Sequence, residues 1–301
     1  MPGYRDLRGS RTPRGGRRPP TLADGLRAHW AVAGVSATGR TLRVHAFGDE
    51  GATAVACLHG ITGNGQLFEG LAAGLGGAYR VLAPDLLGHG DSPREPPWRI
   101  ADHLDAVEHS VDGATIWIGH SFGGRLAFEH AARHPGSVER LVLLDPAILL
   151  PPHVALAAAE SGRRERVYAS FETALDRRYE ESQLHDAPRA LVEAELRRHM
   201  VEDDDGWRYR YSQACVVTAY SEMAAPPPAF IEVRVPTLLV LGADSFLPYD
   251  HLLDAHRDAL GDLLEVVTVP GGHTVLWDAL DETTEAVAGF LARTSAPSAT
   301  A

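Results

Sequence analysis

The chain has 301 residues, a formal net charge of −12 and 45% hydrophobic residues, which is ample apolar sequence for a large globular core. All 28 basic residues are arginine, so Schiff-base chemistry, pyridoxal phosphate anchoring and a lysine-dependent phosphate loop are excluded. Cys57 and Cys215 make neither a disulfide framework nor a metal motif, and we expect a reducing, cytoplasmic location.

The charge is unevenly distributed along the chain. Residues 1–20 contain six arginines and one aspartate, so the remainder carries −12 − 5 = −17. We expect residues 1–20 to form a disordered basic leader, because they are rich in Gly, Pro and Arg. The acidic remainder argues against nucleic acid as a partner. No apolar run approaches the ~20 residues of a membrane span.

From residue 41 onward, short strand patterns alternate with helical ones. The expected strands are 41–47, 54–58, 79–84, 115–118, 141–144, 237–241 and 264–269. The expected helices are 66–75, 100–111, 122–134, 251–260 and 282–291. Several strands are unbroken apolar runs, as in parallel strands that are buried on both faces. The alternation predicts an α/β fold with a doubly wound, mostly parallel sheet.

The alternation stops between residues 151 and 228, a segment that begins and ends with proline runs. An insert between two strands of a parallel sheet must lie above the edge where the loops emerge. We therefore expect an all-helical cap over 151–228 on a core of 21–150 and 229–295. The helical patterns of the cap are 154–168, 171–180 and 188–200.

A serine flanked by glycines carries the strongest functional signal. Ser121 lies in Gly119-His120-Ser121-Phe122-Gly123, between a predicted strand and a predicted helix. A G-x-S-x-G motif in this context predicts a nucleophile elbow, in which a sharp turn exposes the serine hydroxyl. The glycines allow the turn because they have no Cβ.

Three further motifs follow predicted strands. They are His59-Gly60-Ile61, Gly88-His89-Gly90-Asp91-Ser92, and Gly272-His273 with the later pair Trp277-Asp278. Together with the serine motif, they resemble the α/β-hydrolase family from about residue 41 to 291. The resemblance implies an α/β-hydrolase fold with a helical cap and a catalytic triad in the order Ser, Asp, His.

The resemblance also implies roles for the motif residues. His273 would take the proton from Ser121, which is a weak nucleophile by itself. The backbone N–H groups of Ile61 and Phe122 would form the oxyanion hole. This acyl-transfer chemistry needs no metal and no organic cofactor.

The acidic member of the triad has two candidates. Most members of the family carry it after the penultimate strand, often three residues beyond a glycine; here Asp244 follows Gly242 by two residues and Ser245 by three. A subset of hydrolases takes the acid from the end of the preceding strand, where this chain has Asp145. We predict Asp145, with Ser245 hydrogen-bonding beside it, and Asp244 stays an alternative.

The expected substrate is a small carboxylic ester. Candidate substrate-binding residues are His59 and the cap aromatics Trp207 and Tyr211, although these aromatics also suit packing between cap and core. Acyl transfer and carbon–carbon bond hydrolysis use the same triad, so both stay open as alternatives. A non-catalytic receptor for a small ligand on the same fold is a third alternative. The oligomeric state is undetermined.

Overall fold

A seven-stranded sheet forms the centre of the computed structural model, which describes residues 39–184 and 186–293; the expected leader over 1–20 lies outside them. Its strand order is β1-β3-β2-β4-β5-β8-β9, and only β1 is antiparallel to its neighbour. The strands are β1 (Val44–Phe47), β2 (Thr53–Leu58), β3 (Tyr79–Pro84), β4 (Ile116–His120), β5 (Arg140–Leu144), β8 (Thr237–Gly242) and β9 (Leu264–Val269). The predicted α/β fold with a mostly parallel sheet is confirmed.

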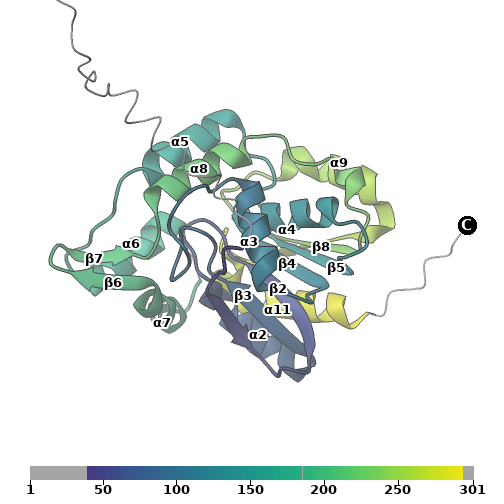
Figure 1. The fold of residues 1–301 in the computed structure, drawn as a ribbon, viewed down its shortest axis with the longest axis horizontal. Coiled ribbons are helices and arrows are strands. Elements are labelled where there is room, and N and C mark those ends of the chain that lie inside the picture. The colour runs from purple at the N-terminus through teal and green to yellow at the C-terminus, as the bar shows by residue number, and fades with distance from the viewer. Residues whose placement is uncertain (1–38, 185, 294–301) are drawn as a thin grey trace, which may run out of the picture. The chain divides into compact units, whose positions relative to one another are not determined.

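The central strands are apolar throughout because both faces of the sheet are covered. In β5, Leu141 and Leu143 pack into one buried cluster, whereas Val142 and Leu144 pack into the other. Helices α3 (Ile100–Ser110), α4 (Phe122–Arg133) and α9 (Asp250–Leu260) contribute to the first cluster, and α2 (Glu69–Leu75) and α11 (Leu280–Ala292) to the second (Figure 1). The remaining short helices of this part are η1 (Gly65–Phe68), η2 (Gly76–Ala78), η3 (Phe230–Glu232), η4 (Gly261–Leu263) and α10 (Val275–Asp278).

The segment between β5 and β8 leaves the sheet, as the sequence predicts. It forms α5 (Pro152–Gly162), α6 (Phe171–Ser182), α7 (Arg189–His199), β6 (Met200–Asp203), β7 (Gly206–Tyr209) and α8 (Gln213–Met223) (Figure 1). The expectation of an all-helical insert is wrong, because β6 and β7 pair as an antiparallel hairpin. The acidic run 203–205 with Gly206 makes its turn, and Trp207 and Tyr209, which alternate along β7, favour an extended strand.

None of the helices in the described residues has the length and hydrophobicity that crossing a bilayer requires.

Close packing at the start of α4 makes Gly123 a sensitive position. A Cβ there would lie 2.0 Å from the backbone oxygen of Leu58, and backbone cannot rotate away. We expect Gly123→Ala to lower the free energy of unfolding by at least about 2 kcal/mol. In contrast, a Cβ at Gly289 in α11 meets nothing within 4 Å, so Gly289→Ala should raise it by up to about 1 kcal/mol. Urea denaturation of both variants tests this, and an equal effect of the two would contradict the packing described.

Candidate active site

The carboxyl ends of neighbouring parallel strands bring the candidate residues to one edge of the sheet. Ser121 follows β4, Asp145 follows β5, Ser245 lies just beyond β8, and His273 comes after β9. These four strands are adjacent in the order β4-β5-β8-β9. The loop after β2 joins them because β2 pairs with β4 on the other side. In open α/β sheets, the crevice at such an edge is the usual ligand site.

The turn at Ser121 is a tight one. Ser121 has φ +54°, a conformation in which non-glycine residues are strained. Its N–H donates to the Leu144 carbonyl at 3.1 Å, and its carbonyl accepts from the Ala147 N–H at 3.0 Å, so the end of β5 holds the turn on both sides. A Cβ at Gly119 would lie 2.2 Å from the Gly123 oxygen, so the strand and the helix meet too closely for a side chain there.

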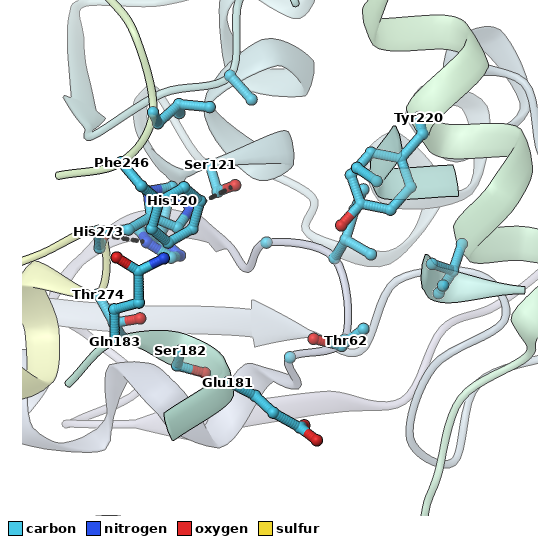
Figure 2. Close-up of a pocket in the computed structure, with 18 of the residues that line it drawn as sticks. Thr62, His120, Ser121, Glu181, Ser182, Gln183, Tyr220, Phe246, His273 and Thr274 are labelled. Atoms are coloured by element: carbon cyan, nitrogen blue, oxygen red, sulfur yellow. Dashed lines mark hydrogen bonds between the residues drawn. The ribbon is translucent and has the colours of Figure 1, made fainter. Parts of the chain in front are cut away.

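A continuous hydrogen-bond chain runs from Ser121 through His273 to Asp145 (Figure 2 draws its Ser121–His273 end). The His273 Nδ1–H donates to Asp145 Oδ2 at 2.6 Å, and the Ser121 Oγ–H donates to His273 Nε2 at 2.9 Å. An ionised carboxylate only accepts, so the proton of the neutral ring belongs on Nδ1. Nε2 is therefore left free to accept the serine proton.

Asp145, rather than Asp244, is the carboxylate that contacts His273. Its Oδ2 also accepts from Ser245 Oγ–H at 2.5 Å, and its Oδ1 accepts from the Gly242 N–H at 3.0 Å. Asp145 is 2% exposed, whereas Asp244 is exposed to solvent and bonds the Gly271 carbonyl through its backbone N–H. The arrangement is the one predicted from the shifted Gly242-to-Asp244 spacing; the catalytic role of Asp145 stays a prediction.

The loop after β2 lies directly against the serine. A Cβ on Gly60 would be 2.8 Å from Ser121 Cβ, so only glycine fits there. Within residues 39–184 and 186–293, no hydrogen-bond acceptor occupies the backbone N–H of Ile61 or of Phe122. Both N–H groups are thus free for an oxyanion, and Ile61 lines the adjoining cavity.

Two neutral histidines hold this loop in place. His59 donates from Nδ1 to the Gly60 carbonyl at 2.7 Å and accepts at Nε2 from the Leu86 N–H at 2.9 Å. His89 accepts at Nε2 from the Thr62 N–H at 3.2 Å, and its Nδ1 lies 3.0 Å from the Leu87 carbonyl. Each ring needs one N–H and one lone pair, which only the neutral imidazole offers. Burial lowers the pKa of His59 to about 4 and that of His89 to about 3.

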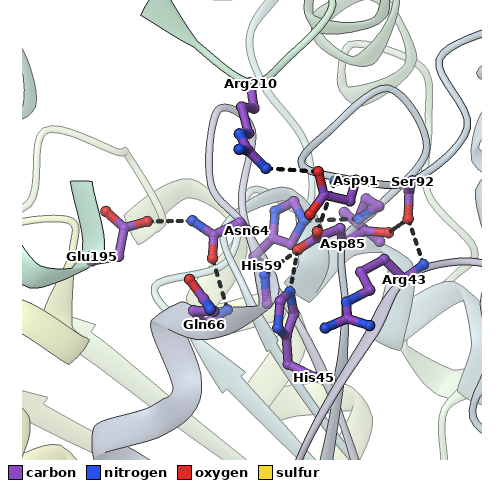
Figure 3. Close-up of polar contacts among 12 residues, drawn as sticks. Arg43, His45, His59, Asn64, Gln66, Asp85, Asp91, Ser92, Glu195 and Arg210 are labelled. Carbon is purple, nitrogen blue, oxygen red and sulfur yellow. Dashed lines mark hydrogen bonds and ion pairs between the residues drawn. The ribbon is translucent and has the colours of Figure 1, made fainter. Parts of the chain in front are cut away.

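Asp85, which follows β3, connects the loop after β2 with the loop after β3 (Figure 3). Its Oδ1 accepts from the Gly65 N–H at 2.9 Å and lies 3.0 Å from His45 Nε2, while its Oδ2 accepts from the Asp91 N–H at 3.0 Å. Burial favours a raised pKa, but the hydrogen bonds from His45 and the backbone outweigh it and hold the pKa of Asp85 far below its usual range.

Helix α7 reaches the loop from the insert. His199 Nε2 lies 2.9 Å from the Thr62 carbonyl, and Asn64 Nδ2 donates to Glu195 Oε1 at 2.5 Å (Figure 3). Thr62 has φ +64°, so this loop is held in a strained conformation by contacts from both core and insert. Burial raises the pKa of Glu195 to about 7, against the opposing charge of Arg178.

A cavity of about 310 Å³ opens on Ser121 and His273. Core loops form one side, and residues of α5 to α8 form the other, among them Tyr220 and Glu181 (Figure 2). Of the expected substrate-binding residues, Tyr211 lines this cavity. Nine-tenths or more of Tyr211 is buried, so only a small part of the residue is exposed at the cavity.

The structure does not bring Trp207 and His59 to the cavity. Trp207 lies four residues before Tyr211, about 13 Å away along an extended chain, and packs against Phe171. His59 is fully buried behind Gly60, where it holds the loop. Their contacts favour structural roles for both residues over the expected substrate binding.

Several charged residues of the cavity are not among those predicted from the sequence. Arg178 continues the buried stripe of α6, which contains Phe171, Ala174 and Leu175. Glu195 lies in α7 among the buried residues Val192, Leu196 and His199. The usable signal was a charged side chain at helical spacing from apolar ones, because such a residue faces inward.

In the described part of the chain, one set of side chains has metal-ligand spacing: Glu108, His130 and His134. None of the three lines the cavity. Both imidazoles already contact Glu108 Oε1, at 3.0 Å from His130 Nδ1 and 2.9 Å from His134 Nε2. Hydrogen bonding therefore accounts for this set without an ion.

Comparison with known proteins places the chain in a family. A model of the alpha/beta hydrolase fold matches residues 53–280. The chain belongs to the α/β-hydrolase family. Lipase LipV of Mycobacterium tuberculosis is 32% identical to this α/β hydrolase over 259 residues, which cover 78% of this chain and 91% of that protein.

Two further similarities concern one activity. The 2-(acetamidomethylene)succinate hydrolase of Mesorhizobium japonicum is 29% identical over 244 residues, or 77% of this chain and 86% of that protein. A crystal structure of E-2-(acetamidomethylene)succinate hydrolase has a TM-score of 0.74 at 24% identity, covering 84% of this chain and 95% of that one. Because its relatives are a lipase and a hydrolase, and its family is that of the α/β hydrolases, the chain is a hydrolase enzyme.

The buried neutral histidines predict that stability falls in mild acid. Their pKa is about 6.5 in the unfolded chain and lower in the folded one, so the unfolded state binds more protons as the pH falls below about 6.5. Each histidine then lowers the free energy of unfolding by up to about 1.4 kcal/mol per pH unit. Urea denaturation at pH 7.5, 6.5 and 5.5 measures this slope, and a flat profile would contradict it. His59→Gln, which does not titrate, should show a shallower slope than wild type.

Proposed function

We propose that this hydrolase cleaves small carboxylic esters through an acyl-enzyme formed on Ser121. The observation that carries the proposal is the unbroken chain of 2.9 Å and 2.6 Å contacts from the Ser121 hydroxyl through His273 to the Asp145 carboxylate, beside a cavity. A serine becomes an effective nucleophile when a base accepts its proton in this geometry.

In the proposed reaction, Ser121 Oγ attacks the ester carbon while its proton moves to His273 Nε2. Asp145 keeps the ring oriented and stabilises the imidazolium that forms, and it remains ionised. The imidazolium then donates its proton to the leaving alcohol. Water, deprotonated by the same ring, attacks the acyl group and frees Ser121. These residues complete the cycle without a cofactor.

The oxyanion that forms at each attack needs hydrogen-bond donors. We assign this role to the unoccupied backbone N–H groups of Ile61 and Phe122, which flank the serine on two sides. Loss of one such donor typically costs about 2.7–4 kcal/mol of transition-state stabilisation. The anchoring of the 60–64 loop by His59, His89 and α7 supports this role, because rigid donors stabilise charge best.

Ester hydrolysis is favoured over acyl transfer, carbon–carbon cleavage and simple ligand binding by the relative named as a lipase. The proposed substrate is a small molecule that fits the cavity, with no role for nucleic acid. We also propose that the protein is cytoplasmic, because Cys57 and Cys215 are both buried free thiols, which suits a reducing compartment.

Ser121 should react covalently with a fluorophosphonate, because this electrophile traps an activated serine. Ser121→Ala should abolish both the labelling and the turnover of p-nitrophenyl acetate. Peptide mass spectrometry and release of p-nitrophenol measure the two effects. Ester turnover that survives Ser121→Ala above the uncatalysed rate would refute the mechanism.

The two candidate acids give a matched pair of variants. Asp145→Asn should lower kcat by up to about 10⁴-fold, since the amide cannot stabilise the imidazolium and favours the wrong tautomer. Asp244→Asn, at an exposed site, should lose tenfold or less. Ser245→Ala should fall between them through its lost hydrogen bond to Asp145. If circular dichroism shows that both variants are folded and Asp244→Asn has the greater defect, the catalytic acid is Asp244 and not Asp145.

A further inference from the structure

Arg178 is an unpaired cation in the wall of the cavity that opens on Ser121. It lies on α6 in line with buried apolar residues, which places its half-buried side chain inward. Across residues 39–184 and 186–293, the guanidinium makes no hydrogen bond and no ion pair, and its Nε is buried without a partner. Its N–H donors are therefore available to a ligand in the cavity, and a ligand would relieve the cost of the unpartnered Nε.

Two aromatic rings hold the Arg178 guanidinium in position. Its central carbon lies 5.0 Å from the ring centre of Trp277 and 5.6 Å from that of Tyr209, and both rings are buried. Cation–π contacts with two rings restrict the position of a guanidinium and leave its N–H groups free to donate. The side chain is thus preorganised for a planar anion.

The acidic residues of the cavity compensate the charge of Arg178 only in part. Arg166 also lines the cavity, but its Nη1 pairs with Glu181 at 2.5 Å, so these two charges cancel. Glu195 is the remaining acidic residue of the lining and bonds Asn64 rather than Arg178. With a pKa of about 7, Glu195 is partly neutral near neutral pH and offsets Arg178 incompletely.

We propose that Arg178 binds a second, ionised carboxylate of the substrate, so that the enzyme prefers monoesters of dicarboxylic acids. A carboxylate accepts two parallel N–H bonds from a guanidinium, which matches the free edge of Arg178. The inference rests on the proposed ester hydrolysis, because it requires the ester group at Ser121 and the acyl chain extending to α6. In a partly buried cavity, such a pairing is stronger than at the protein surface, because less water competes for either charge.

Matched esters test this preference. The charged series comprises p-nitrophenyl monoesters of glutaric, adipic, pimelic and suberic acid, and in each neutral partner an isopropyl group replaces the carboxylate. The readout is the ratio of kcat/KM for the charged ester to that for its partner, after subtraction of uncatalysed hydrolysis. For the wild type, we expect a ratio of about 10 or more at one chain length.

Three variants locate the effect. Arg178→Met should lower the ratio about 10- to 100-fold, which is the usual range for a lost charge-assisted hydrogen bond. Arg178→Lys should lie between, because it keeps the charge but loses the planar pair of donors. Arg177→Met is the matched control: Arg177 is the exposed neighbour on α6, pairs with Glu180, and should leave the ratio unchanged. Melting curves confirm that each variant is folded.

A wild-type ratio at or below one for every chain length would overturn the inference, as would an unchanged ratio in Arg178→Met. Failure of the proposed function looks different, since neither series would then be turned over. In that case, calorimetric titration of Ser121→Ala with adipate decides the anion site separately. Adipate binding that disappears when Arg178→Met is added supports the site, and no binding to Ser121→Ala overturns it.

Discussion

The buried carboxylate of Asp145 is the group on which the geometry of the site depends. It accepts hydrogen bonds from the His273 ring, the Ser245 hydroxyl and the Gly242 backbone, and so joins the ends of β5 and β8 to the loop after β9. A buried ion without such donors would be strongly destabilising. Satisfying the charge and orienting the imidazole are therefore one structural requirement. Ser121, which backbone hydrogen bonds hold at the end of β5, meets the ring oriented in this way.

The insert contributes to the site in two ways. It covers the cavity, and it holds the loop after β2 through the contacts of Glu195 and His199 with Asn64 and Thr62. The wall that we propose for the acyl chain and the loop that we assign to the oxyanion are thus linked through α6 and α7. A change in the insert can therefore affect both which ester binds and how well the transition state is stabilised.

Much of the fold was predictable because its signals are local. The apolar runs of β2, β4, β5 and β8 follow from burial on both faces, and the Gly119 to Gly123 motif marks the turn at Ser121. The pairing of Asp145 with Ser245 could be predicted because the usual position of the acid holds a serine. In contrast, the hairpin after α7 escaped prediction, since its short strands adjoin a strong helical pattern.

The contacts that depend on tertiary distance could not be predicted. Trp207 and Tyr211 share an aromatic alternation, yet only Tyr211 reaches the cavity, because Tyr211 pairs with His89 of the core whereas Trp207 pairs with Tyr168 of the insert. The helical spacing of Arg178 from Phe171 and Leu175 indicates only that it faces inward; its contact with Trp277, almost one hundred residues later, needs the fold.

The acyl-enzyme on Ser121 is the central claim, and rapid-quench mass spectrometry tests it most directly. During turnover of a p-nitrophenyl ester, acid quenching within the first turnovers preserves the covalent intermediate. We expect the peptide that contains Ser121 to gain the mass of the acyl group, and Ser121→Ala to show no adduct. Sustained turnover with no acyl group on Ser121 at any quench time, or with the adduct on another residue, would contradict the account.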